Sequence, residues 1–319
     1  MTGEPDPTGP GTVLITGGTG SLGFETAKAI AGAGRGLIPV ITGRGQAAVE
    51  RAAIELTAAT GSTVRGMPLD LASLDDVRRF VEDLTSAVSS GSLPPLRTVV
   101  CNAGIQSVAG TRLTADGFEQ TFGVNHLAHF LLVRELLPHL VAPARIVFVA
   151  SGTHDPAQRT GMPDPVYTSA RRLAVPDGAE PGGTNTLGRR RYTTSKLCNV
   201  LTTYELARRI ESERPGESIT VNAFDPGLMP GTGLARDYGR VQAFVWNRVM
   251  PALTVLPGHN IHTPRRSGAA LARLVLDDDL RGTTGRYFEG RKEIRSSKES
   301  YDRARQLDLW QTSVELTRA

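Results

Sequence analysis

The sequence predicts a single α/β domain of the Rossmann type, doubly wound, with a seven-stranded, mainly parallel sheet and helices on both faces. Two observations support this fold class. Short apolar runs rich in β-branched residues alternate with longer helical patterns, which is typical of a parallel sheet covered by helices. A glycine-rich loop directly follows the first run, and 319 residues, 39% of them hydrophobic, can bury the core of one large domain.

The seven expected strands are short runs separated by turn or helix patterns: 13–15, 37–41, 64–69, 98–101, 146–149, 219–224 and 285–288. Pro39 is unusual inside the second run, because proline removes a ladder donor and normally lies at an edge, a strand end or a bulge. From Arg291 onward, apolar residues that include Leu309 and Trp310 recur at helical spacing and predict a last helix. Residues 1–10 are expected to form a disordered tail before one domain that spans 11–319.

Composition excludes several classes of function. The chain has no run of eighteen apolar residues and does not open on a signal-peptide pattern, so we expect a cytoplasmic protein without an integral membrane segment. The formal charge of +4 comes from scattered arginines, which argues against nucleic acid as a partner. The six histidines lack metal-ligand spacing, so no metal is expected. We interpret Cys101 and Cys198 as reduced, buried thiols.

The loop after the first expected strand runs Thr16-Gly17-Gly18-Thr19-Gly20-Ser21-Leu22-Gly23 and precedes a helical pattern. Gly18, Gly20 and Gly23 fit the GxGxxG pattern in the required setting of strand, loop and helix. Glycines let the backbone approach a pyrophosphate, and the helix N-terminus offers free N–H groups and a favourable dipole. We therefore expect residues 17–23 to bind a dinucleotide; the alternative is a flexible turn.

Arg44 follows the second expected strand, where an NAD-binding unit usually carries an acidic residue for the ribose 2′-hydroxyl. A carboxylate would repel a 2′-phosphate, whereas arginine offers a planar, permanently charged fork that matches phosphate geometry. This position therefore favours NADP(H) over NAD(H). The alternative is an ordinary surface arginine.

Tyr192 and Lys196 lie four residues apart in a helical pattern that Tyr192 opens, and Ser151 follows the fifth expected strand. The spacing of four puts both side chains on one helix face. A free tyrosine, with a pKa of about 10, is a poor proton shuttle at neutral pH. An ammonium group about 4 Å away is worth about 4 kcal/mol at an effective dielectric near 20, which would lower that pKa by roughly three units. The alternative is an exposed pair on an ordinary helix.

Taken together, these motifs resemble the short-chain dehydrogenase/reductase family. The matching segments follow the family's order over about residues 12–290: the glycine loop, Leu69-Asp70-Leu71, Cys101-Asn102-Ala103-Gly104, Gly123-Val124-Asn125-His126, Val149-Ala150-Ser151, Tyr192 to Lys196 and Asp225-Pro226-Gly227. As a set they are far more specific than any single motif. The resemblance implies a Rossmann-type fold and hydride transfer with a nicotinamide cofactor.

The resemblance also implies roles for the matched positions. Ser151 would orient a substrate carbonyl, Tyr192 would transfer the proton at its oxygen, and Lys196 would hold the nicotinamide ribose and lower the tyrosine pKa. Asn125 would anchor a proton-relay water. The cofactor groove would also include Asp70, Leu71, Asn102, Ala103, Gly104, Pro226 and Gly227. Taken singly, a helix cap for Asp70, a turn for Asn102 and a packed polar residue for Asn125 remain open.

Two departures from the family pattern stand out. Ser21 replaces the middle glycine of TGxxxGxG, with Gly20 one place earlier; similar loops in ketoreductase relatives imply that binding survives. Ser151 and Tyr192 lie 41 residues apart, which is longer than the usual spacing. This insertion of residues 152–191, together with the Ser-Lys-Leu-Cys-Asn run that ends at Asn199, resembles the branch of retinol dehydrogenases and protochlorophyllide reductases.

We therefore expect NADP(H)-dependent hydride transfer between nicotinamide and the carbonyl or alcohol carbon of a bulky, apolar small molecule, with Tyr192 as general acid/base. The insertion and residues 228–262 would build the pocket, the latter as a substrate lid; packed helices or an oligomer surface are the alternative for 228–262. The competing hypothesis is a noncatalytic NADP(H)-binding regulatory or scaffold protein. We expect a monomer or a homodimer.

Overall fold

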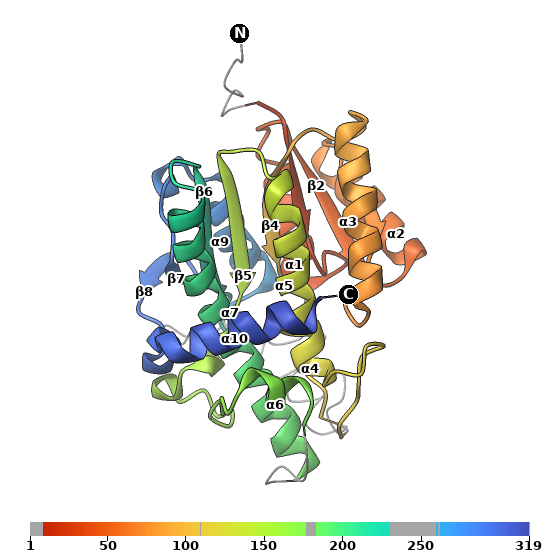
Figure 1. Cartoon of the computed structure of the whole chain (residues 1–319). Helices are drawn as coiled ribbons and strands as arrows, with labels where there is room; N and C mark the ends of the chain where they lie inside the picture. The colour runs from red at the N-terminus through yellow and green to blue at the C-terminus, as the bar shows by residue number, and fades with distance from the viewer. Residues whose placement is uncertain (1–8, 109, 177–182, 230–259, 261, 319) are drawn as a thin grey trace.

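The computed structural model describes residues 9–108, 110–176, 183–229, 260 and 262–318, so most of the expected N-terminal tail lies outside them. The expected α/β architecture is confirmed, with one sheet in the order β3-β2-β1-β4-β5-β6-β7-β8 (Figure 1). The strands are Gly11–Ile15 (β1), Leu37–Gly43 (β2), Arg65–Pro68 (β3), Leu96–Cys101 (β4), Ala144–Val149 (β5), Ile219–Asp225 (β6), Arg286–Glu289 (β7) and Lys292–Ile294 (β8). The first seven pair in parallel.

Within the described residues the sheet has eight strands, so the prediction of seven is wrong by one. The extra strand, β8, pairs antiparallel with β7 at the edge of the sheet. Its three residues, Lys-Glu-Ile, form no apolar run. The strand forms because Gly290, at a φ of +54°, turns the chain back along β7. The prediction relied on runs of apolar residues, and such runs do not reveal a strand that forms because a tight turn places it beside its neighbour.

Pro39 lies in β2, which is an interior strand of the sheet. It pairs with Val13 of β1, whereas pairing between β2 and β3 begins only at Val40. The proline therefore lies where β2 has a single strand neighbour. No ladder to β3 is interrupted, which explains how the sheet accepts a residue without an N–H group.

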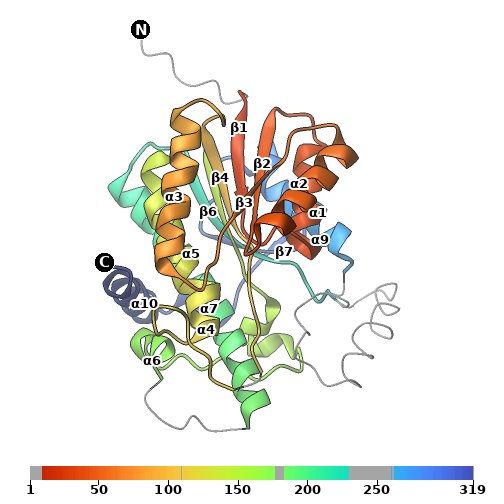
Figure 2. The ribbon, with the colours of Figure 1, turned by 90° about the vertical axis from the view of Figure 1, so that its right-hand side faces the viewer.

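Helices cover both faces of the sheet (Figure 2). Ser73 caps one of them by accepting a hydrogen bond from the Asp76 N–H group, and Gly61 ends another in the left-handed conformation. One face of the sheet carries α3 (Leu74–Ser89), which Ser73 caps, together with α5 (Ala128–Leu136) and α7 (Thr184–Glu213). The other carries α1 (Ser21–Ala31), α2 (Gln46–Thr60) and α9 (Pro264–Leu276).

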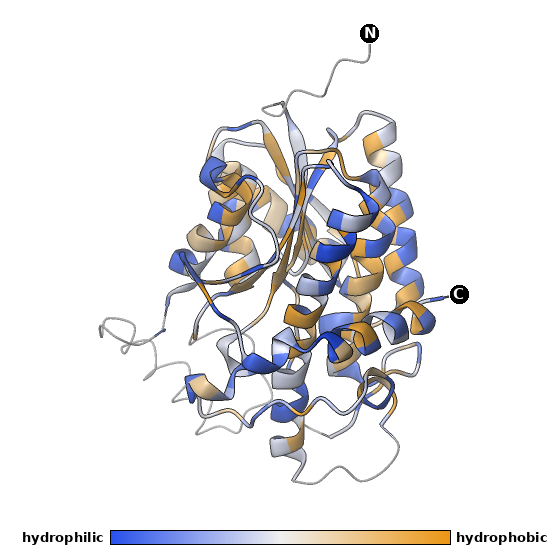
Figure 3. Cartoon of the chain, turned by 60° about the vertical axis from the view of Figure 1, so that its left-hand side comes forward, coloured by the Kyte–Doolittle hydropathy of each residue, from blue (hydrophilic) through white to orange (hydrophobic). Residues whose placement is uncertain are grey.

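Apolar residues gather on the strands and on the helix sides that face them, with polar residues outside (Figure 3). Alternate residues of one strand enter opposite layers of the core. Phe148 packs in the layer that contains α3 and α5, and its neighbour Val147 packs with α1 and α9. Successive side chains of a strand point to opposite faces, so β5 supports both layers. Among the described residues, no helix is both long enough and apolar enough to span a membrane.

The predicted last helix is present as α10 (Arg303–Leu316) and lies across α5 and α7 (Figure 1). Trp310 meets Phe130 of α5 edge to face, with ring centroids 5.0 Å apart. The Arg209 guanidinium of α7 lies 4.6 Å from the Trp310 ring centroid. These contacts pack the C-terminal segment onto the core.

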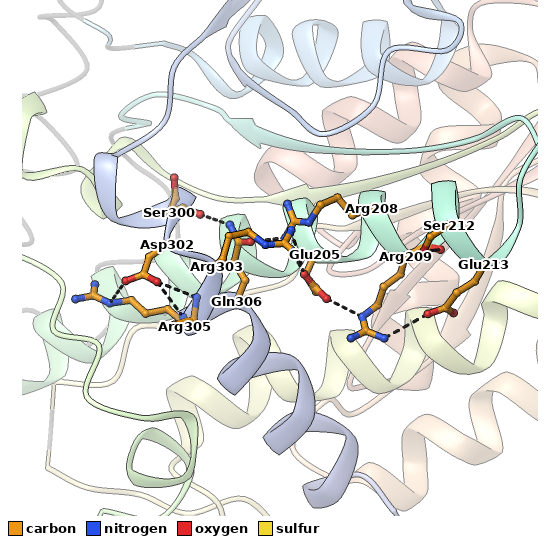
Figure 4. A network of polar contacts seen from close by, with 11 residues as sticks. Glu205, Arg208, Arg209, Ser212, Glu213, Ser300, Asp302, Arg303, Arg305 and Gln306 are labelled. Carbon is orange, nitrogen blue, oxygen red and sulfur yellow. Dashed lines mark hydrogen bonds and ion pairs between the residues drawn. The ribbon is translucent and has the colours of Figure 1, made fainter.

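A buried carboxylate adds a polar link between α7 and α10 (Figure 4). Glu205 of α7, with its side chain 4% exposed, pairs with Arg208 at 2.7 Å, with Arg209 at 2.8 Å and with Arg303 of α10 at 3.7 Å. Three guanidinium groups thus compensate one desolvated charge. The C-terminal helix is held by charge as well as by apolar packing.

Candidate active site

The loop between β1 and α1 requires glycine at three positions. A Cβ atom added to Gly17, whose φ is +67°, would lie 2.9 Å from Ala103 Cα. One added to Gly18 would lie 2.6 Å from Ile41 Cβ, and one on Gly23 would lie 2.5 Å from the Gly17 carbonyl oxygen. No side chain caps the start of α1. The loop therefore presents tightly folded backbone and uncapped N–H groups, as a phosphate site needs.

The other two small residues of this loop behave differently. A Cβ atom on Gly20 would meet nothing within 4 Å, so packing does not require glycine there. Ser21, which takes the place of the family glycine, has a φ of +50°. That left-handed conformation favours glycine and costs other residues about 1 kcal/mol or more. The departure seen in the sequence is thus a point of backbone strain.

The predicted cofactor residues on the neighbouring strands lie at the same edge of the sheet. The Asn102 side-chain amide donates to the carbonyl oxygens of Thr16 at 2.7 Å and Gly17 at 3.2 Å, which binds the end of β4 to the glycine loop. Arg44 is exposed after β2. Asp70 follows β3 and accepts from the Ala72 N–H group at 3.0 Å. Because Ser73 is the cap of α3, the helix-cap alternative for Asp70 is wrong.

Tyr192 and Lys196 are both buried on α7. The Lys196 Nζ atom lies 5.6 Å from the centroid of the Tyr192 ring and donates to the Val149 carbonyl oxygen of β5 at 2.9 Å. Burial lowers the Lys196 pKa to about 8, with the charge of Asp225 acting in the opposite direction. A lysine with that pKa stays mostly cationic at neutral pH. The alternative of an exposed tyrosine and lysine is wrong.

The helix that carries Tyr192 begins at Thr184, so the expectation that Tyr192 opens it is wrong. About two more turns lie within the insertion. Gly188 explains why: its Cα packs so closely on the chain at Ser107 and Val108 that a Cβ atom would lie 2.8 Å from Val108 Cα. Tertiary contact extends the helix into a segment that shows little periodicity.

Asn125 lies in a π-helical turn, Gly123–Leu127, and is fully buried. Its side chain exchanges two hydrogen bonds with the Ile105 backbone, at 2.7 and 2.9 Å, and donates to Ser195 Oγ at 3.0 Å. Such π-turns are rare and often occur at functional sites. Asn125 thus joins the loop after β4 to the helix of Tyr192 and Lys196.

Ser151 lies two residues beyond the end of β5, whose last carbonyl group, that of Val149, accepts from Lys196. Its hydroxyl accepts from the Thr153 N–H group at 3.3 Å. Behind it, His154 is fully buried and its Nδ1 atom lies 2.7 Å from the Ser151 carbonyl oxygen. Neither His154 nor His129 of α5 is among the site residues that the sequence predicts. The signal available was a histidine three or four residues after a candidate catalytic residue.

Asp225 ends β6 and is buried behind the site. Its Oδ1 atom accepts from the Gly227 N–H group at 2.9 Å, and Gly227 adopts a φ of +75°. Burial raises the Asp225 pKa to about 6. The expected lid, 228–262, lies almost wholly outside the described residues, and the lid assignment remains a prediction.

Both cysteines are buried free thiols, and burial raises the pKa of each, so neither resembles a reactive thiolate. In the part of the chain that the structure describes, no three His, Cys, Asp or Glu side chains are grouped to hold a metal ion. The fold and the glycine loop have the features of a dinucleotide-binding α/β protein, and the buried tyrosine–lysine pair lies at the same edge of its sheet as a candidate acid–base site.

Comparisons with known proteins agree with that class. A family model described as short chain dehydrogenase matches residues 11–171. The chain is 31% identical to short-chain dehydrogenase iccH of Talaromyces variabilis, over 95% of this chain and 94% of that one. It is 32% identical to protochlorophyllide reductase B of Hordeum vulgare, over 96% and 78%. A crystal structure of an uncharacterized protein from Mycobacterium paratuberculosis matches with a TM-score of 0.68 and 26% identity, over 97% and 95%.

The chain therefore belongs to the short-chain dehydrogenase/reductase family of oxidoreductases, close to its protochlorophyllide reductase-like branch. This confirms the family that the motifs indicate. The retinol dehydrogenase part of the expectation remains a prediction.

Proposed function

We propose that this protein is an NADP(H)-dependent oxidoreductase that transfers hydride between the nicotinamide and a carbonyl or alcohol carbon of a bulky, apolar small molecule. The observation that carries the proposal is the burial of Tyr192 beside Lys196, with the lysine held on the carbonyl group that ends β5. A buried cation beside a phenol stabilises the phenolate and suits Tyr192 to acid–base work.

The residues around the glycine loop fit a dinucleotide. The crowding at Gly17 and Gly23 folds the backbone tightly, and the uncapped start of α1 offers N–H groups to a pyrophosphate. Residues 17–23 would hold the phosphates, and Lys196 with Tyr192 would contact the nicotinamide ribose. The rest of the groove would comprise Asp70, Leu71, Asn102, Ala103, Gly104, Pro226 and Gly227. When bound, the nicotinamide supplies or accepts the hydride.

The chain's own residues would then orient the substrate and move a proton. Ser151 would hold the substrate oxygen by hydrogen bonding, and Tyr192 would donate a proton to it in reduction or remove one in oxidation. Lys196 would stabilise the resulting phenolate by its charge. Asn125 would hold a water molecule through which the proton is replaced.

Arg44 supports NADP(H) over NAD(H). It is exposed immediately after β2, and the arginine fork suits a 2′-phosphate. The branch supports a bulky, apolar substrate, because a protochlorophyllide reductase is among the relatives. A cytoplasmic location and a possible homodimer remain predictions, and several relatives carry chloroplastic in their names.

The first test is a titration of NADPH and NADH by nicotinamide fluorescence. Wild type should prefer NADPH by about tenfold or more, and Arg44→Ala should lose that preference while keeping its NADH affinity. Arg65→Ala is the matched control, since Arg65 is an exposed arginine at the opposite, amino end of β3. Equal binding of both cofactors by wild type would overturn the NADP(H) proposal.

The second test measures turnover of bulky apolar aldehydes and ketones with NADPH. Tyr192→Phe should lower kcat by roughly 10²- to 10⁴-fold, because the phenol that moves the proton is gone, with the NADPH dissociation constant little changed. Tyr301→Phe, at an exposed tyrosine, should keep wild-type kcat. Tight NADPH binding by wild type without turnover of any carbonyl would favour the noncatalytic alternative.

A further inference from the structure

The Thr16 hydroxyl is a buried junction beneath the glycine loop. Its Oγ1 atom accepts from two backbone N–H groups at the end of β4, Asn102 at 2.9 Å and Ala103 at 3.0 Å. Those bonds occupy both lone pairs of the oxygen, so the hydroxyl proton must be donated elsewhere. The His129 Nε2 atom lies 2.8 Å away, closer than the Val100 carbonyl oxygen at 3.4 Å.

The second ring nitrogen of His129 determines the tautomer. Nδ1 lies 3.2 Å from the Asn125 carbonyl oxygen, which can only accept. Nδ1 therefore carries the proton and donates it to Asn125, while Nε2 accepts from Thr16. A directed chain of hydrogen bonds runs from the base of the glycine loop, through one imidazole, to the backbone of Asn125.

Burial keeps this chain of hydrogen bonds intact. Thr16, Asn125 and His129 are each 0% exposed. Burial lowers the His129 pKa to about 4, aided by the charge of Lys196 and opposed by the bond to Asn125, so the ring is neutral at pH 7. A buried polar atom that loses its partner is costly, and each link therefore constrains its neighbours.

We propose that His129 is a positioning residue that couples the glycine loop to the backbone of Asn125, the residue that would hold the proton-relay water. One nitrogen holds the loop through Thr16, and the other orients the carbonyl group of Asn125 in the π-turn against α7. The inference rests on the proposed function, because it assigns a shared support to the dinucleotide site and the acid–base site of that function.

Two conservative variants separate the two links. His129→Asn retains a donor near the position of Nδ1 and loses the acceptor for Thr16, so the NADPH dissociation constant should rise by about three- to tenfold with kcat little changed. His129→Gln retains an acceptor near Nε2 and loses the donor to Asn125, so kcat should fall by a similar factor with NADPH affinity kept. Thr16→Val leaves the imidazole in place but removes the hydroxyl that donates to it, so this variant should also weaken NADPH binding.

His154 is the matched control, because it is equally buried and its Nδ1 atom also meets the carbonyl group of a candidate catalytic residue. Its Nε2 atom accepts from the Ser297 N–H group at 3.1 Å rather than from the glycine loop. His154→Asn should therefore leave the NADPH dissociation constant unchanged. Nicotinamide fluorescence, steady-state turnover and thermal unfolding are measured on the full chain for every variant.

The results distinguish the two levels of proposal. Failure of wild type to bind NADPH would overturn the proposed function and this inference with it. If wild type binds and turns over, equal losses in both His129 variants, or no loss in either, would overturn only the coupling. If one His129 variant does not fold, Thr16→Val decides, and unchanged NADPH affinity in it would also overturn the coupling.

Discussion

The cofactor half and the substrate half of the candidate site are held in different ways. In the cofactor half, glycines and polar groups from neighbouring elements fix the loop, as in the bonds from the Asn102 side-chain amide to the carbonyl oxygens of Thr16 and Gly17. In the substrate half, hydrogen bonds join the insertion, residues 152–191, to the C-terminal segment that includes α10. The Tyr167 hydroxyl donates to Asp308 at 2.7 Å, and His154 accepts from Ser297, pairs separated by 141 and 143 residues.

This difference has a functional consequence. The glycine loop is held by groups at the end of β4 and on α5, whereas the insertion is held by the C-terminal segment, so a change in that segment acts first on the contacts of the insertion. Variation in the C-terminal segment should thus alter substrate handling and spare cofactor binding.

The largest effect on the free energy of unfolding is expected from a fall in pH, because two buried histidines link the glycine loop and α10 to the core. His126 bonds to Ser313 of α10 and His129 bonds to Thr16, and burial lowers their pKa values to about 3 and about 4. Below the ordinary histidine pKa of about 6.5, these two histidines bind protons in the unfolded chain but remain neutral in the native chain. From pH 7 to pH 5 each histidine should reduce the free energy of unfolding by about 2 kcal/mol.

Asp225 acts in the opposite direction. Its native pKa of about 6 lies above the ordinary value. Between pH 7 and pH 5, Asp225 therefore binds a proton in the native chain but not in the unfolded chain, and the free energy of unfolding rises by about 1 kcal/mol. Urea unfolding at both pH values should still show a net loss of stability, and His126→Gln should remove the roughly 2 kcal/mol that His126 contributes to that loss. Equal stability at pH 7 and pH 5 would contradict the buried neutral histidines.

The next effect concerns Asp308, whose carboxylate also accepts from the Ala170 N–H group at 2.9 Å. Asp308→Ala leaves both donors of the insertion without this acceptor, so the free energy of unfolding should fall by about 1–3 kcal/mol. We expect KM for the carbonyl substrate to rise and the NADPH dissociation constant to stay within about twofold. A matching loss of NADPH affinity would show that the halves are not separate.

The smallest effect on the free energy of unfolding is expected from glycine substitutions at two strained residues, one in each half of the site. Ser21 in the glycine loop and Arg159 in the insertion have φ values of +50° and +47°. Glycine at either position should relieve strain, partly offset by the entropy of the unfolded chain, for a net gain of up to about 1 kcal/mol. Urea unfolding measures the gain. Only Ser21→Gly should change NADPH affinity, and an equal change in Arg159→Gly would contradict the assignment of the loop.

Sequence reasoning succeeds where a residue's role follows from local geometry. The left-handed conformation of Gly17, the close approach of Gly23 to the Gly17 carbonyl oxygen and the shared helix face of Tyr192 and Lys196 follow from backbone geometry and helical spacing. It fails where a neighbour decides the structure. Strand β8 exists because β7 lies beside it, and α7 begins at Thr184 because Gly188 packs on the loop after β4.

The sequence by itself determined the alternation of strands and helices, the glycine loop after the first strand and the shared helix face of Tyr192 and Lys196, because hydrophobic periodicity and motif spacing are properties of adjacent residues. Only the tertiary structure decided which buried side chains support that pair. The Nδ1 partners of His129 and His154 are near in the sequence, at Asn125 and Ser151, but their Nε2 partners, Thr16 and Ser297, lie 113 and 143 residues away in the chain. Folding alone brings those groups within hydrogen-bond distance.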